Sequence, residues 1–345
     1  MASETNTLAA SPGNRRRQAE TTVWRRIAAL DQGSIVILNA LLLAAALAIF
    51  LPEFASWGNL MTLLRSVSVL GILALGMTVV IMGRGIDLSQ IAVAMVSAGI
   101  AVKLMIGGLA MPAALVVGLL TALGLGLFNG AFVAFFGVPA LFATLASGLL
   151  IIGVARITVL PLRLFNVPAD SALLALGQSW KGIPAPVLVF GLCIVGLYIF
   201  MSRTTLGRFI YAHGDNPETA RFSGMPVRLL TLLEYAICSV IGYVGGIVMV
   251  ASTGVVDLLV VNRSMLVFDV IMVAVLGGVS LVGGRGSVRG VVAGALLVGV
   301  LLNAMTLMNL DYQLESIIKG AALLAAIVLD NWLHPRDEET AAEGE

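Results

Sequence analysis

Charged residues are scarce in this chain. Only 11% of its 345 residues are Asp, Glu, Lys or Arg, and 59% are hydrophobic, whereas a soluble domain carries roughly 25% charged residues. A mean hydropathy of +1.03 is also unsuited to a hydrated surface. These values exclude a fold built on one or two soluble cores. They predict an all-α polytopic membrane protein, because lipid must be the solvent for most of the chain.

Residues that carry catalytic or metal chemistry are also few. The two cysteines, Cys193 and Cys238, each lie in an apolar run, so neither a disulfide framework nor a metal site is expected. None of the three lysines stands in a phosphate-binding G-x-x-x-x-G-K-[ST] loop, and neither H-E-x-x-H nor G-x-S-x-G occurs. A net charge of +1 gives no reason to expect a nucleic-acid partner. The sequence therefore predicts a non-catalytic chain without a cofactor or metal.

Long apolar stretches fill most of the sequence. A helix that crosses the hydrocarbon needs about 20 mostly apolar residues. This length divides the chain into about ten candidate spans: 34–51, 64–83, 89–107, 112–136, 140–160, 186–202, 229–251, 265–283, 290–309 and 314–333. The breaks at 83–87 and 137–139 are the only interruptions of two very long apolar runs.

The distribution of Lys and Arg predicts the orientation of these spans. With the N-terminus inside, thirteen of the 20 basic residues fall on the inner side and seven fall outside or near outer span ends. Cytoplasmic connections carry an excess of Lys and Arg, so both termini are expected in the cytoplasm. The expected organisation is a basic cytoplasmic tail over 1–33, a transmembrane domain over 34–333 and an acidic cytoplasmic tail over 334–345.

Two connections between spans are long. Residues 161–185 form a predicted outer loop with little helical pattern, and residues 203–228 form a polar, Arg-rich inner segment. In the inner segment Asn216 precedes Pro217, which is the pattern of an N-cap followed by proline in the first turn. Gly224 then predicts a stop, so a short helix is expected over 217–223. Such a segment is either a solvated linker or a docking element.

Ionisable side chains are rare at the centres of the predicted spans. Four lie within about a turn or two of span ends: Glu234, Asp269, Glu315 and Lys319. Glu315 and Lys319, spaced i and i+4, are expected to neutralise each other on one helix. Asp87 and Asp269 could bind a ligand, but single acids at helix ends are more often caps. This pattern argues against a proton-driven carrier, which keeps charges at mid-membrane depth.

Small residues and two amides stand out inside the spans. The 38 glycines let helices approach closely in lipid. Asn129, beside Phe128, and Asn303 place uncharged hydrogen-bonding groups within predicted spans. Such amides either bond a neighbouring helix or face a cavity and bind a neutral hydroxylated solute. Phe128, Asn129 and Asn303 are therefore the candidate residues of a solute path.

Several sequence blocks resemble one known family. Residues 203–224, RTTLGRFIYAHGDNPETARFSG, are similar to the cytoplasmic loop of the ribose/galactose/xylose-type permeases of ABC importers, which reads R-T-x-x-G-R-x-x-x-A-x-G-x-N-x-x-A-A-R-x-S-G. The other blocks follow in order with fitting spacing over residues 57–331: NLMTLLRSVSVLGILALGMT (59–78), GIDLS (85–89), GLFNG (126–130), GVP (137–139), GGVSLVGGRGS (277–287), Lys319-Gly320 and Leu329-Asp330.

This resemblance implies a multi-pass permease of the bacterial inner membrane. It implies a homo- or heterodimer of permease subunits, two ATP-hydrolysing subunits and a periplasmic sugar-binding protein, with the solute path shared between the two permeases. It also implies that 203–228 is a coupling segment whose short helix contacts the ATPase. The residues expected at that contact are Gly214, Asn216, Pro217, Glu218, Ala220, Arg221 and Gly224.

Two departures from the family pattern bear on the solute. Arg84 stands where glycine is usual, and Val267 stands where an acid is frequent, although Asp269 is retained. The favoured function is the permease subunit of an importer for a small neutral sugar or polyol. One alternative is a branched-chain amino acid importer permease, whose zwitterionic solute would ask for paired charges in the path. The other is a stand-alone ion-coupled carrier.

Overall fold

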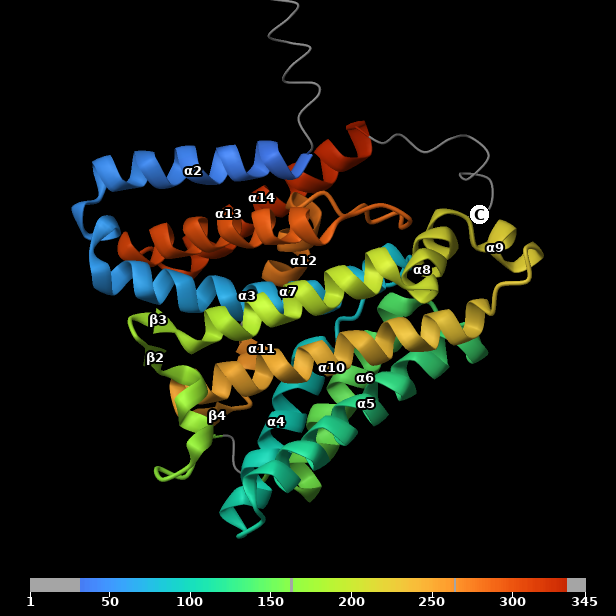
Figure 1. Ribbon diagram of the computed structural model, residues 1–345, viewed down its shortest axis with the longest axis horizontal. Helices are drawn as coiled ribbons and strands as arrows, with labels where there is room; N and C mark the ends of the chain where they lie inside the picture. The colour runs from blue at the N-terminus through green and yellow to red at the C-terminus, as the bar shows by residue number, and fades with distance from the viewer. Residues whose placement is uncertain (1–31, 162–163, 264, 334–345) are drawn as a thin grey trace, which may run out of the picture.

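The computed structural model describes residues 32–161, 164–263 and 265–333 (Figure 1). The predicted tails lie outside these residues, apart from positions 32 and 33. The helices are α2 (Gln32–Phe50), α3 (Trp57–Met82), α4 (Gln90–Ile106), α5 (Met111–Phe136), α6 (Ala140–Thr158), α7 (Ala185–Arg203), α8 (Thr205–Asp215), α9 (Pro217–Phe222), α10 (Val227–Thr253), α11 (Val260–Arg263), α12 (Leu266–Leu276), α13 (Val288–Leu307) and α14 (Tyr312–Leu333). The strands are β1 (Leu164–Asn166), β2 (Ser179–Trp180), β3 (Ile183–Pro184) and β4 (Val255–Asp257).

The all-α class predicted from composition is confirmed. Seven helices of the described chain are long and apolar enough to cross a membrane: α2, α3, α5, α6, α7, α10 and α13. The shorter apolar helices α4 and α12 and the more charged helix α14 occupy the other three predicted ranges. Each of the ten ranges thus holds one helix, and the break at 83–87 separates α3 from α4 as expected.

The predicted span 265–283 is too long. Helix α12 ends at Leu276, and residues 277–287 form a loop in which Gly278, Gly283 and Gly284 all have positive φ. Side chains other than glycine rarely adopt that backbone region, so these residues direct the chain out of the helix. Hydropathy did not predict this loop, because Val279, Leu281 and Val282 continue the apolar run.

Helices α3, α4 and α10 form the centre of the bundle. The side chains of α3 from Leu70 to Met82 are nearly all buried, as are those of α4 from Gln90 to Gly99. Glycine permits the close approach of α10 to α4, because a Cβ on Gly246 would lie 2.6 Å from the carbonyl oxygen of Ala94. The outer helices, such as α7, instead expose apolar side chains to the surroundings, as helices in lipid do.

Short strands and turns occupy one end of the bundle, at the left of Figure 1. Strands β1 and β4 pair antiparallel with Phe165 opposite Val256, and β2 pairs with β3. The connection predicted as an outer loop, 161–185, contains three of these strands and a 3-10 helix over Ala172–Gly177. Helices α8 and α9 lie at the opposite end, which we call the α8–α9 end.

Candidate functional site

Helix α9 has the local structure that the sequence predicts. The Asn216 side chain accepts a 2.8 Å hydrogen bond from the backbone N–H of Thr219, and Pro217 occupies the first turn together with Glu218. An acid in this turn is stabilised by the positive end of the helix dipole. Gly224 follows the helix with φ +78°, and the N–H of Met225 bonds the carbonyl of Ala220 at 3.1 Å. The helix ends at Phe222, one residue before the predicted end.

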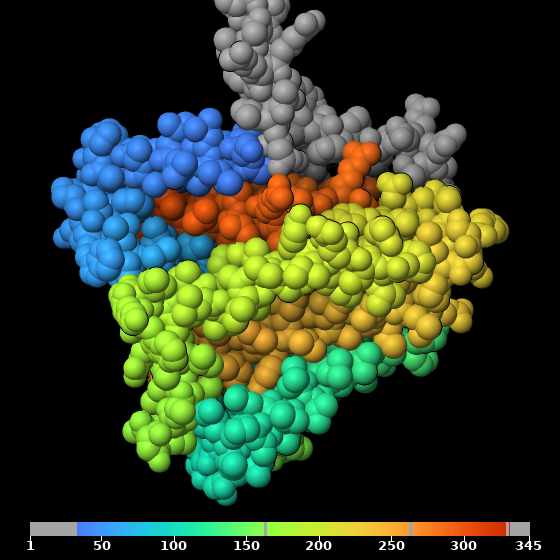
Figure 2. Space-filling model, viewed as in Figure 1, coloured from blue at the N-terminus to red at the C-terminus, as the bar shows by residue number. Residues whose placement is uncertain are grey.

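The surface of α9 combines exposed charge with an exposed aromatic ring. Glu218 and Arg221 are exposed and the Phe222 side chain is 86% exposed, whereas Ala220 packs inward. In the space-filling view, the segment from α8 to the start of α10 protrudes at the right-hand edge (Figure 2). The tip of this protruding segment therefore presents both charged side chains and an aromatic ring to the surroundings.

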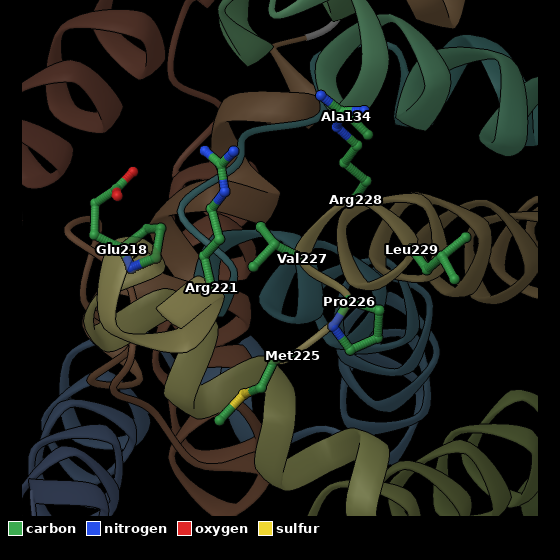
Figure 3. Close-up of a pocket in the computed structure, with 9 residues that line it drawn as sticks. Ala134, Glu218, Arg221, Met225, Pro226, Val227, Arg228 and Leu229 are labelled. Atoms are coloured by element: carbon green, nitrogen blue, oxygen red, sulfur yellow. The ribbon is translucent and has the colours of Figure 1, made fainter. Parts of the chain in front are cut away.

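A hollow of about 510 Å³ lies beside α9, between this helix, the start of α10 and α5. Arg221 and Arg228 extend their guanidinium groups toward the same side of this hollow, and Glu218 lies at its edge (Figure 3). Its other lining residues are Ala134, Pro217, Met225, Pro226, Val227 and Leu229. The hollow is therefore a basic recess bordered by one carboxylate.

Helix α8 is fixed to the rest of the bundle at its last turn. The Arg84 guanidinium donates to the carbonyl oxygens of Gly214 and Asp215, both at 2.8 Å. These carbonyls have no partner inside the helix, so a cation suits them. A Cβ on Gly214 would lie 1.7 Å from the carbonyl oxygen of Met82, and that oxygen accepts a 2.8 Å bond from the N–H of Gly284. Helix α8 thus contacts both the end of α3 and the 277–287 loop.

A buried polar pair joins α8 to α10. His213 Nδ1 lies 3.1 Å from Glu234 Oε1, and the two side chains are 8% and 1% exposed. The carboxyl group of Glu234 in turn packs over Gly83. On the same helix, Tyr211 donates a 3.1 Å bond to the carbonyl of Gly286, and burial raises the pKa of its phenol. The short α9 therefore follows a helix that is held at several points.

The seven residues predicted at the coupling contact belong to one continuous structure. Six of them form α9 and its two ends, and Gly214 lies in the last turn of α8. Sequence reasoning missed Arg84, His213 and Glu234 as supports of this structure. The sequence did mark Arg84, because it stands where the family usually has glycine, and its φ is +69°. It also marked His213, which is one of only two histidines.

The three predicted solute-path residues are not brought together. Asn303 on α13 exchanges two hydrogen bonds with Asn59 on α3, at 2.8 and 3.0 Å. Asn129 on α5 is buried and donates to Ser89 at 2.6 Å, and the Ser89 hydroxyl donates to Asp87. Phe128 is partly exposed and packs edge-to-face on Phe132. Both amides therefore bond neighbouring elements, which was one of their two expected roles.

The structure tests two predictions about acids. Asp87 accepts from the backbone N–H of Ser89 at 3.0 Å in the turn before α4, but it is not the cap of that helix, because Ser89 occupies the N-cap position. Lys319 pairs with Asp269 of α12 at 3.2 Å, and among the described residues no ion pair joins it to Glu315. The predicted i, i+4 pair is wrong because α12 packs on α14 and supplies a nearer carboxylate. No group of three His, Cys, Asp or Glu side chains that could hold a metal is found in the described ranges.

Comparison with known proteins shows which family this sequence matches. The profile of a family described as "Branched-chain amino acid transport system / permease component" matches residues 59–327. The ribose import permease protein RbsC of Escherichia coli K12 is 32% identical over 308 residues, which cover 88% of this chain and 94% of RbsC. No solved structure matches the chain significantly.

Two further relatives are named as transport proteins for pentoses. The L-arabinose transport system permease protein AraH of Escherichia coli K12 is 32% identical over 316 residues, covering 88% of this chain and 91% of AraH. The xylose transport system permease protein XylH of the same strain is 31% identical over 339 residues, covering 81% and 86%.

The apolar spans and these relatives define the class of the protein. It is a multi-pass inner-membrane protein and a permease subunit of an ABC importer. The chain belongs to the ribose/arabinose/xylose-type permease family, as its sequence blocks suggested.

Proposed function

We propose that this chain forms the membrane path of an ATP-driven importer for a small neutral sugar or polyol. A periplasmic binding protein delivers the solute, a second permease subunit completes the path, and ATPase subunits at the cytoplasmic α8–α9 end supply the energy. The names of three relatives, which refer to ribose, arabinose and xylose, support this class of solute.

One observation carries the coupling part of the proposal: α9 is exposed while α8, which precedes it, is anchored. Arg84 and the His213–Glu234 pair connect α8 to the end of α3 and to α10. A force applied to α9 is therefore passed to two central helices as a rigid-body shift, instead of being absorbed in a flexible linker. The basic recess beside α9 favours an ATPase surface with acidic groups.

Glu218→Arg tests this role. The substitution reverses the charge of the carboxylate that borders the recess of Arg221 and Arg228, so it should repel a basic ATPase group that pairs with Glu218. We expect ATP-driven uptake of radiolabelled ribose, arabinose or xylose in vesicles to fall by at least about tenfold, as for loss of a central contact. The Glu218 side chain is exposed, so the amount of inserted, folded permease should not change.

Asp170→Arg is the matched control, because Asp170 is exposed and lies in the predicted outer loop. It makes the same change of charge away from the α8–α9 end and should leave uptake and ATPase co-purification intact. Wild-type uptake by Glu218→Arg would count against docking at α9. Uptake by the purified chain alone, driven by an ion gradient without any ATPase, would favour the stand-alone carrier instead.

A branched-chain amino acid is the second candidate solute. The description of the matching family and the Asp269–Lys319 charge pair favour it. Lys319 Nζ and Asp269 Oδ2 bind each other at 3.2 Å, so a zwitterion would have to separate the two side chains before binding, at a cost in electrostatic energy. We therefore expect no competition by excess leucine against pentose uptake, and ATP-driven uptake of leucine in the same vesicles would reverse the assignment.

A further inference from the structure

The Asp269–Lys319 pair joins an otherwise apolar helix, α12, to the more charged helix α14. Asp269 lies in the first turn of α12 and Lys319 in the first half of α14, and the side chains are 7% and 18% exposed. Charged side chains within membrane segments are costly and mark functional sites when they persist. Packing of α14 on α12 does not require the pair, since two apolar side chains of similar volume would stabilise the contact equally or better.

The pair leaves hydrogen-bonding capacity unused. Asp269 Oδ1 is buried and has no partner among the described residues, and the Lys319 ammonium donates to Asp269 Oδ2 at 3.2 Å. A buried carboxylate oxygen without a donor is destabilising unless a ligand supplies one. A ligand with several hydroxyl groups offers both the donor that Asp269 lacks and acceptors for the remaining Lys319 N–H groups.

Two hollows meet beside this pair. The first, about 160 Å³, contains Asp269 and Lys319 and is lined in addition by Met265, Phe268, Met272, Ser316, Gly320 and Leu323. The second, about 320 Å³, shares Met265 and Phe268 with it and reaches α4, α6 and Tyr312. We call the two together the α12–α14 groove.

Exposed aromatic rings lie along the α12–α14 groove. Phe268 is 46% exposed and Tyr312 58% exposed. Apolar and aromatic walls with a few convergent polar groups are the usual composition of a small-molecule site. A sugar ring has apolar C–H faces that pack on aromatic rings and hydroxyl groups at its edge, so this composition suits it.

Gly320 keeps space open next to the pair. A Cβ at this position would meet no atom within 4 Å, and its φ is not in the left-handed region. Glycines at helix contacts in this chain behave differently, as at Gly294, where a Cβ would lie 2.2 Å from the Val273 carbonyl oxygen. Gly320 is therefore not required for helix packing.

We propose that the transported sugar passes along the α12–α14 groove. Asp269 accepts from and Lys319 donates to its hydroxyl groups, while Phe268 and Tyr312 support the face of its ring. This inference rests on the proposed function, and it replaces Phe128, Asn129 and Asn303 as the principal solute contacts. The groove lies at the surface of the chain, as expected for one half of a path that a second permease subunit completes.

The double variant Asp269→Leu/Lys319→Leu separates a solute role from a structural one. A pair that serves packing alone predicts unchanged uptake and an unchanged or higher melting temperature. The groove proposal predicts the same stability but a fall of about a hundredfold in ATP-driven uptake of radiolabelled ribose, arabinose or xylose, one decade for each of the two lost contacts. Wild-type uptake in this double variant would overturn the proposal.

A steric test compares three glycines that have open space around their Cβ positions: Gly320, Gly196 on α7 and Gly124, one helical turn before Phe128. Each is changed to Leu in the complete importer, with ATP hydrolysis stimulated by the binding protein as a second readout. We expect Gly320→Leu to block uptake while ATP hydrolysis persists, and Gly196→Leu and Gly124→Leu to transport normally. If Gly124→Leu blocks uptake and Gly320→Leu does not, the groove proposal is wrong and the solute path lies beside Phe128 and Asn129.

A third measurement does not depend on the identity of the solute. In a Cys193→Ser background, in which Cys238 is fully buried, Ser316→Cys in the groove is compared with Leu192→Cys on the exposed apolar face of α7. A membrane-impermeant thiol reagent should label the groove position about tenfold faster, because thiolate forms only where water reaches. Equal, slow labelling of both would overturn the groove. If the groove position is labelled but the importer takes up no sugar, the proposed sugar function is wrong, whereas the inference that the groove is a water-filled path is supported.

Discussion

Gly214→Val is expected to abolish ATP-driven uptake and to destabilise the α8–α9 end of the permease. A Cβ at this position would lie 1.7 Å from the Met82 carbonyl oxygen and 2.6 Å from the Gly284 nitrogen. Both are backbone atoms that bond each other, so neither can move aside as a flexible side chain would. We expect a loss of at least about 3 kcal/mol, the upper range for overpacking, measured as a lower melting temperature together with lost co-purification of the ATPase.

Gly196→Val is the matched control for this substitution. It makes the same change of residue inside another helix, with the same intrinsic loss of helix propensity, but its Cβ meets nothing within 4 Å. Its stability and uptake should stay close to those of the wild type. If Gly214→Val behaves like Gly196→Val, α8 is not packed tightly against the end of α3, and the rigid connection proposed for coupling is absent.

The features that the sequence predicted well depend on neighbouring residues. The Asn216-Pro217-Glu218 start and the Gly224 stop of α9 need only local backbone chemistry, and both occur as expected. Spans are likewise local, because each must satisfy its own backbone hydrogen bonds in lipid. The exception is α12, where glycines with positive φ end a helix inside a continuous apolar run.

The features that escaped prediction depend on contacts between distant residues. Arg84 bonds carbonyls 130 and 131 residues away, and Asp269 meets Lys319 across 50 residues. In sequence, Glu315 was the obvious partner for Lys319, because i, i+4 spacing is visible without a fold. Which charge is nearer was decided by the packing of α12 on α14, and no pattern within one helix contains that information.

Glu234→Ala is expected to uncouple ATP hydrolysis from transport. The substitution removes the partner of buried His213 and leaves a cavity over Gly83. Removing one member of a buried pair costs about 3–5 kcal/mol, because the other is left unsatisfied. The exposed surface of α9 is unchanged, so the ATPase should still bind and hydrolyse ATP. We expect fewer sugar molecules imported per ATP hydrolysed, measured in the complete importer, since α8 is no longer held to α10.

Glu234→Gln provides the graded control, since it keeps the shape and a hydrogen bond to His213 and should cost only about 1 kcal/mol. A double-mutant cycle with His213→Ala then isolates the pair: if the two groups act together, the double variant is less destabilised than the sum of the single variants. Co-purification of the ATPase distinguishes Glu234→Ala, in which it should persist, from Gly214→Val, in which ATPase binding and uptake should both be lost. Full coupling in Glu234→Ala would mean that the other contacts of α8 transmit its motion, among them the bonds of Arg84 to Gly214 and Asp215.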